Sequence, residues 1–275
     1  MKLTIPFVCL GLLGCDAETA QKPEPWSMLP VSDWPDIVLT NEVQFADTAF
    51  HELANAFLVD LGTDTVGVTA KHIFMIFGKR RGLTSIDLGS GFMQWDLRSL
   101  KPGAKGMEAL TLINQDPQEP IGDFNSLKVR DWLVFDVDAA GGDVHPLRPR
   151  SVPVEKGDTV YAVGRSLANR RSPDPTVFPL RVYQAVGPYY YVQPLDPGAD
   201  PVVTSGSPVI DGGGYLIGLV SGAAGRLGVV CSLEYLMQVL DRYGVQSVRS
   251  PSETRRDPGP HWTDAPPNTR LELTR

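Results

Sequence analysis

The chain has 275 residues, 42% of them hydrophobic, and a formal net charge of −7 at pH 7. This hydrophobic content is enough for one large all-β domain or two small barrels, which argues against a disordered chain. The acidic balance, without a basic run or aromatic residues interleaved with basic ones, excludes nucleic acid as a partner.

The first 15 residues, MKLTIPFVCLGLLGC, place Lys2 before an apolar run that ends at Cys15. Such a run is typical of an export signal and is too short to span a bilayer as a mature helix. Its last four residues resemble the lipobox of bacterial lipoproteins, in which cleavage before the cysteine leaves a thiol that is acylated, for example with palmitate. We therefore expect residues 1–15 to be a lipoprotein signal peptide.

A lipid on Cys15 would hold the chain on a membrane of the bacterial cell envelope, on the extracytoplasmic side. Asp16 follows Cys15 and resembles an inner-membrane retention signal, but the choice of membrane stays open. The alternative is an ordinary apolar segment with an incidental cysteine.

Cysteine and histidine usage sets limits on cross-links and metals. Cys9 lies in the signal and Cys15 is the expected lipid site, so only Cys231 remains for the folded part. No disulfide within the folded part is then expected. The four histidines are scattered and Cys231 is isolated, so we expect no metal site and no cofactor.

Two flanking segments differ in composition from the centre of the chain. Residues 16–35 are polar and contain prolines, which predicts a flexible tether. Residues 250–275 are rich in proline and charge, which predicts a disordered tail. The folded domain is therefore expected over residues 36–249.

Short segments of β type, separated by turn signals, fill the centre of the chain. They cover residues 56–62, 65–73, 131–137, 158–165, 181–186, 189–195, 207–211, 215–222 and 227–232. The three glycines at 212–214 predict a hairpin. One helix is expected over residues 233–243, with Ser232 as its N-cap and Gly244 after its end. Many short strands with one late helix indicate a sandwich or a barrel.

Three local sequences carry side chains that can act together. His72 ends the strand-like run TAKH, Asp131 begins the apolar run DWLVF, and Ser205 begins the small-residue turn SGSP before a strand. A serine hydroxyl is a poor nucleophile unless a histidine accepts its proton, and a carboxylate must orient that histidine. Taken singly, His72 is more typical of a buried histidine and Ser205 of a turn serine, and Asp131 could be a strand-end acid bound to a turn.

In this order, and each beside its expected strand, the three motifs resemble those of the chymotrypsin-like (trypsin-like) serine peptidases. The resemblance implies an all-β fold of two six-stranded antiparallel β-barrels with a C-terminal helix. It implies a serine endopeptidase that forms an acyl-enzyme on Ser205, with His72 as general base and Asp131 orienting it. The substrate would be a peptide or protein.

The resemblance also assigns binding residues around the nucleophile. The N–H groups of Val203 and Ser205 would form the oxyanion hole. Two segments would line the substrate pocket and offer backbone to an extended peptide. Their residues are Ala199 and Asp200 on one side, and Val220, Ser221 and Gly222 on the other.

Val203 departs from the family pattern, which has glycine two residues before the nucleophile. A β-branched residue resists the backbone torsions that turn this N–H towards the oxyanion. An alternative function is therefore a catalytically impaired module of the same fold that binds or senses peptides. A third is an unrelated structural β-lipoprotein in which the motifs are coincidental.

Overall fold

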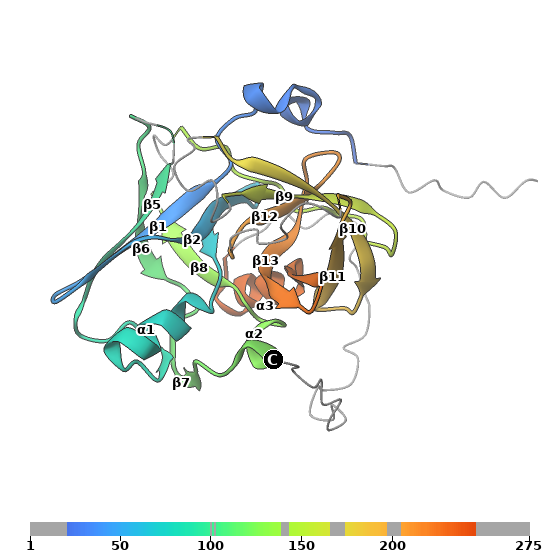
Figure 1. Ribbon diagram of the computed structural model, residues 1–275. Coiled ribbons are helices and arrows are strands. Elements are labelled where there is room, and N and C mark those ends of the chain that lie inside the picture. Colours follow the sequence, from blue (N-terminus) through green and yellow to red (C-terminus); the bar gives the residue numbers. More distant parts are fainter. Residues whose placement is uncertain are drawn as a thin grey trace, which may run out of the picture.

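The computed structural model describes residues 21–99, 101, 103–138, 143–165, 174–196 and 205–245. Antiparallel strands in this part of the chain close into two six-stranded barrels (Figure 1). The first has the order β1-β2-β3-β8-β6-β5 and consists of β1 Leu39–Phe45, β2 Ala49–Asp60, β3 Thr65–Thr69, β8 Leu133–Val137, β6 Met107–Leu112 and β5 Phe92–Ser99. The second has the order β10-β11-β14-β13-β12-β9 and consists of β10 Thr176–Ala185, β11 Tyr189–Pro194, β14 Leu227–Ser232, β13 Leu216–Ala224, β12 Pro208–Asp211 and β9 Thr159–Gly164.

Shorter elements complete the described part of the chain. They are the two-stranded sheet of β4 Ser85–Ile86 and β7 Asp116–Pro120, the helices α1 Ile73–Arg81, α2 Phe124–Leu127 and α3 Leu233–Arg242, and the 3-10 turns η1 Pro25–Met28 and η2 Val31–Asp33. The predicted all-β class, with two six-stranded barrels and a C-terminal helix, is confirmed.

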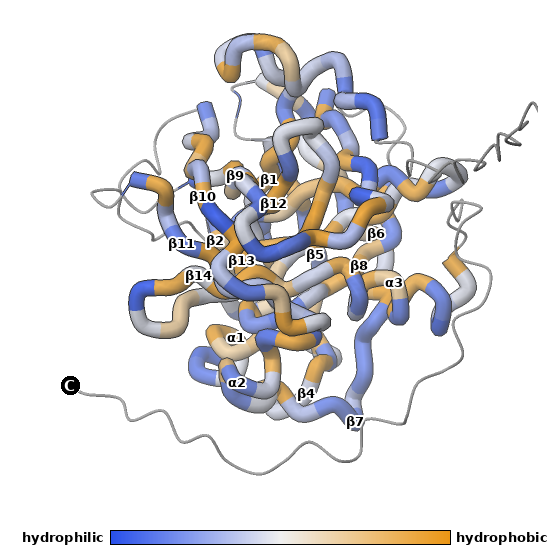
Figure 2. Tube along the Cα trace, turned by 90° about the vertical axis from the view of Figure 1, so that its right-hand side faces the viewer, coloured by the Kyte–Doolittle hydropathy of each residue, from blue (hydrophilic) through white to orange (hydrophobic). Residues whose placement is uncertain are grey.

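Hydrophobic side chains gather in three places. One cluster fills the first barrel around Phe45 and Trp95, and another fills the second barrel around Val160 and Val209. The third lies where the barrels meet and includes Trp132, whose indole nitrogen donates to the Ser232 carbonyl (2.9 Å). Figure 2 shows the hydrophobic residues concentrated in the strands that face this interior. The two barrels therefore share one continuous apolar interface.

Helix α3 and the triple-glycine hairpin follow their local signals. The Glu234 N–H donates to the Ser232 hydroxyl (3.3 Å), and Gly244 adopts a left-handed φ of 70° after the last turn. The hairpin joins β12 to β13, and Asp211 accepts from the Gly213 and Tyr215 N–H groups (2.8 and 3.0 Å). Both predictions are confirmed because capping and turn residues act within a few positions.

The prediction of a strand over residues 65–73 is wrong at its end. Strand β3 stops at Thr69, and helix α1 starts directly after His72. The helix buries Ile73, Phe74 and Phe77 in the first-barrel core. A short apolar run without clear periodicity fits a buried strand and a buried helix equally well.

The prediction of a flexible tether over residues 16–35 is wrong for residues 21–35, which we call the N-terminal strap. The Tyr215 hydroxyl donates to the Lys22 carbonyl (2.5 Å), and Trp26 is only 7% exposed. The Trp26 ring contacts Trp34 edge to face and packs against His145. Two tryptophans supply the apolar area that orders this polar segment, an effect that average composition conceals.

Burial gives Cys231 its chemical character. Cys231 is the one cysteine among the described residues, and its side chain is fully buried. This burial raises the pKa of its thiol. The thiol is therefore inert in the folded protein.

The described residues contain no helix long and apolar enough to cross a membrane. The predicted signal 1–15 and tail 250–275 lie outside the described residues.

Replacing Trp26 with alanine tests the docking of the strap. We expect Trp26→Ala to lower the free energy of unfolding by about 3 kcal/mol, the lower end of the range for a buried tryptophan. Met28→Ala, in the same strap but 71% exposed, should change it by less than about 0.5 kcal/mol. Urea denaturation measures both, and equal effects would contradict a docked strap.

Candidate active site

His72 and Asp131 meet because their strands pair. Thr69 of β3 lies opposite Leu133 of β8, so the segment that follows β3 and the segment that precedes β8 come together at the same end of the first barrel. The ring nitrogen Nδ1 of His72 lies 2.7 Å from Asp131 Oδ2. The backbone N–H of His72 donates to Asp131 Oδ1 (2.8 Å). Both carboxylate oxygens therefore hold the histidine.

Ser221 supplies a further donor to this carboxylate from the other barrel. Its hydroxyl donates to Asp131 Oδ2, and both residues are buried. A buried carboxylate is tolerated only when donors surround it. Because Ser221 belongs to β13, the carboxylate of the first barrel is hydrogen-bonded by both barrels.

Ser205 sits in a turn that is fixed by neighbours on both sides. The Asn55 N–H donates to the Ser205 carbonyl, and the Gly206 N–H donates to the Val220 carbonyl (2.8 Å each). Gly206 has a φ of 80°, and a Cβ at this position would collide with the Asn55 carbonyl. Only glycine fits this turn, so the residue after Ser205 is dictated by the close approach of β2.

A chain of buried polar side chains supports this turn from the first barrel. The Asn55 amide donates to the Ser207 hydroxyl (2.7 Å), and Thr69 Oγ1 donates to the Asn55 carbonyl (2.7 Å). The Asn41 amide in turn donates to Thr69 Oγ1 (3.0 Å). Sequence reasoning missed Asn41 and Asn55, because their role depends on strand register rather than on a local motif.

Phe124 is a further residue of the site that sequence reasoning missed. A Cβ on Gly222 would collide with the Phe124 ring, so the ring lies directly on the backbone of β13. The same ring lies 6.3 Å from the His72 ring, centroid to centroid. Asp123 fixes the start of α2 by a capping box with Ser126. The only signal in the sequence was a glycine in one segment and an aromatic residue in another, and no spacing rule connects the two.

Lys71, next to His72, is buried completely and compensated locally. Its ammonium donates to Glu119 Oε1 (2.9 Å) and to the Tyr235 hydroxyl (3.0 Å). Glu119 belongs to β7 and Tyr235 to α3, so Lys71 links the segment before His72 to the C-terminal helix. A buried ammonium without such partners would be strongly destabilising.

The structure brings His72, Asp131 and Ser221 into direct contact and places Ser205 in a turn against β2 and β13. Both main-chain groups of Val220 bond to the turn, through the Ser207 carbonyl and the Gly206 N–H. The main chain of Val220 is therefore already paired within the fold. Four of the predicted residues lie outside the described residues: Cys15, Ala199, Asp200 and Val203.

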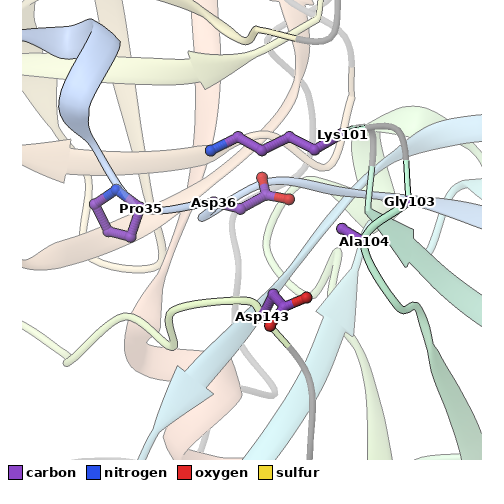
Figure 3. Close-up of a pocket in the computed structure, with 6 residues that line it drawn as sticks. All are labelled: Pro35, Asp36, Lys101, Gly103, Ala104 and Asp143. Carbon is purple, nitrogen blue, oxygen red and sulfur yellow. The ribbon is translucent and has the colours of Figure 1, made fainter.

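A cavity of about 470 Å³ lies near the start of β1, and neither His72 nor Ser205 lines it. It is lined by Pro35, Asp36, Lys101, Gly103, Ala104 and Asp143 (Figure 3). Within the described residues, no group of three or more histidine, cysteine or acidic side chains could hold a metal ion.

Comparison with known proteins identifies the fold. No family model and no curated protein matches the chain. Among solved structures, the active form of the Rv3671c protease from M. tuberculosis is similar, with 19% identity over 90% of this chain and 97% of that chain, and a TM-score of 0.51. The serine endoprotease from Yersinia pestis has 15% identity over 76% of this chain and 63% of that chain, with a TM-score of 0.48. The first likeness shows that the fold is the chymotrypsin-like double barrel.

Removing the Ser221 hydroxyl tests its contact with the buried carboxylate. We expect Ser221→Ala to lower the free energy of unfolding by about 1–3 kcal/mol, because one donor to Asp131 is lost. Ser32→Ala, which removes an exposed hydroxyl, should have an effect within about 0.5 kcal/mol of zero. Chemical denaturation of both variants measures the difference. A neutral Ser221→Ala would show that Asp131 does not depend on the second barrel.

Proposed function

We propose that this chymotrypsin-like double barrel is a serine endopeptidase that hydrolyses peptide bonds of extracytoplasmic proteins. One observation carries the proposal: a fully buried Asp131 holds the Nδ1 side of the His72 ring at the junction of the barrels. A donor bond from Nδ1–H to the carboxylate leaves Nε2 as the proton acceptor. The imidazole is then in the tautomer that a general base requires.

In the proposed reaction, Ser205 Oγ attacks the carbonyl carbon of the scissile bond while His72 Nε2 accepts the hydroxyl proton. The histidine then gives this proton to the leaving amine, and the acyl group stays on Ser205 as an ester. A water molecule, deprotonated by the same histidine, attacks the ester and releases the acid. Asp131 stabilises the imidazolium that forms in each half of the reaction.

Stabilisation of the oxyanion is assigned to the N–H groups of Ser205 and Val203. The left-handed Gly206 and its bond to Val220 fix the chain on the far side of Ser205. This anchoring favours a rigid turn at the nucleophile. The proposal requires Val203, a β-branched residue, to turn its N–H inward.

The proposed setting is the bacterial cell envelope. Cleavage before Cys15 and acylation of its thiol would anchor the enzyme to a membrane, with the double barrel on the extracytoplasmic side. A domain with one cysteine, fully buried, suits this setting because its stability does not depend on disulfide formation. Intact-mass analysis of protein extracted from membranes would show the lipid on Cys15.

A fluorophosphonate probe, which labels activated serines, tests the nucleophile. We expect the wild-type protein to be labelled, and both Ser205→Ala and His72→Ala to lose labelling. Asp131→Asn should slow labelling by about 10⁴-fold because it favours the wrong tautomer. Ser32→Ala, an exposed serine in the strap, is the matched control and should be labelled like the wild type.

A folded wild-type protein that is never labelled would contradict catalysis. Val203→Gly then separates two explanations. Labelling restored by this change would place the defect in the oxyanion hole. Continued absence of labelling would favour the alternative, a module of this fold that binds or senses peptides without turnover.

We propose that Phe124 limits the size of one substrate side chain. The side chain belongs to the residue just before the one whose carbonyl carbon is attacked. An extended peptide that pairs with β13 beyond Ser221 must lie beside the Phe124 ring, because this ring covers Gly222 and packs near His72. We expect the wild type to prefer small side chains at that position. Phe124→Ala should raise kcat/KM for bulky side chains there by about 10-fold or more relative to alanine. A peptide library with one varied position measures this ratio, and an unchanged ratio would contradict the assignment.

A further inference from the structure

The outer surface of the N-terminal strap exposes apolar side chains that the fold does not use. Met28 is 71% exposed, Leu29 48% and Val31 47%. We call residues Met28–Val31 the apolar tip. Three of the nine large hydrophobic residues that are exposed in the described part of the chain lie in these four positions. Exposed apolar side chains gathered in this way mark a surface that another apolar phase covers.

The conformation of the apolar tip is fixed by contacts of Trp34 and Trp26. The Trp34 indole nitrogen donates to the Leu29 carbonyl (2.9 Å), which closes the loop between η1 and η2. Trp26 anchors the same loop to the body, with its ring against Trp34. The tip is therefore preorganised, and its apolar side chains can enter another phase with little loss of conformational entropy.

The strap also lies close in sequence to the proposed lipid. Gln21 is fixed to the body, since the Ser151 N–H donates to its side-chain oxygen (3.0 Å). Six residue steps separate it from Cys15, and even a fully extended chain spans no more than about 22 Å over that length. A lipid on Cys15 would hold the strap near the bilayer, and at high effective concentration there.

We propose that the apolar tip inserts into the interfacial layer of the lipid bilayer and docks the strap face of the protein on the membrane. The inference rests on the proposed anchoring at Cys15 and assigns it a second, reversible contact. A lipid at the end of a chain segment holds a protein on the membrane without fixing its orientation. The apolar tip would fix that orientation.

The charges around the tip favour an apolar contact over an electrostatic one. Asp33 is the exposed acid at its edge, and Arg148 nearby is paired with Glu24 and Asp60. The one basic residue of the strap, Lys22, is exposed six positions before the tip. A single exposed cation contributes little at physiological salt, so docking should depend only weakly on salt and should not require anionic lipids.

Docking in this orientation has a consequence for the substrate. The strap lies at one end of the molecule, and helices α1 and α2, which flank His72, lie at the opposite end (Figures 1 and 2). The catalytic face would then point away from the bilayer. The substrate class is therefore proteins in the aqueous phase, rather than segments within the membrane.

The test uses protein from Asp16 to Arg275, which keeps every described residue, with a hexahistidine tag in place of residues 1–15. The tag holds it on phosphatidylcholine vesicles that contain a nickel-chelating lipid, so the result does not depend on natural acylation of Cys15. An environment-sensitive dye is attached at Met28→Cys or, as control, at Met93→Cys, which is 63% exposed on β5. Cys231 is buried and does not react.

Brominated lipid should quench the dye at position 28 by about half, the result expected for insertion of 5–10 Å, and leave the dye at position 93 unchanged. Adding Leu29→Ser and Val31→Ser should abolish the quenching without changing the melting temperature. Adding 0.5 M salt should leave the quenching in place. Equal quenching at both positions, or unchanged access of aqueous iodide to position 28, would overturn the proposal. If the dye at position 28 is protected from iodide without vesicles, and more so at higher protein concentration, the proposal is overturned. The tip would then bind a second copy of the protein.

Discussion

The carboxylate of Asp131 has no exposed surface, and both barrels supply its donors. His72 holds it from the first barrel through its ring and its backbone N–H, and Ser221 holds it from the second. Burying a charge without such partners costs several kcal/mol, so the barrels can dock over this carboxylate because His72 and Ser221 replace the water around it. Assembly of the two barrels therefore completes the donor set that holds the proposed catalytic base.

The turn at Ser205, in the second barrel, is likewise held by a buried hydrogen bond from the first barrel. Asn55 of the first barrel bonds to Ser207 of the second, and both side chains are buried. Just before Asn55, strand β2 is irregular, with a left-handed φ of 52° at both Glu52 and Ala54. Backbone strain of this kind is found where a fold must present a group in a fixed position. Here it brings the Asn55 amide and N–H to the turn at Ser205.

The parts of the structure that were predicted correctly depend on neighbours in sequence. Helix α3 has its own cap, the β12–β13 hairpin has its own glycines, and His72 and Asp131 lie two or three residues from the ends of recognisable strands. The parts that were missed depend on distant contacts. Asn55 and Ser207 are 152 residues apart, and Phe124 meets Gly222 only in the folded chain. The strap was missed because the average composition of residues 16–35 conceals two tryptophans that pack on each other.

The docking of the strap sets an order of maturation. Its partner in the β12–β13 hairpin, Tyr215, follows Lys22 by 193 residues. For a chain that crosses a membrane N-terminus first, the strap emerges at the start but finds its site only when most of the polypeptide has followed. Contacts of such long sequence separation form late in folding. In the proposed export, the processing site would thus stay accessible during translocation, and the strap would dock only when the double barrel is complete.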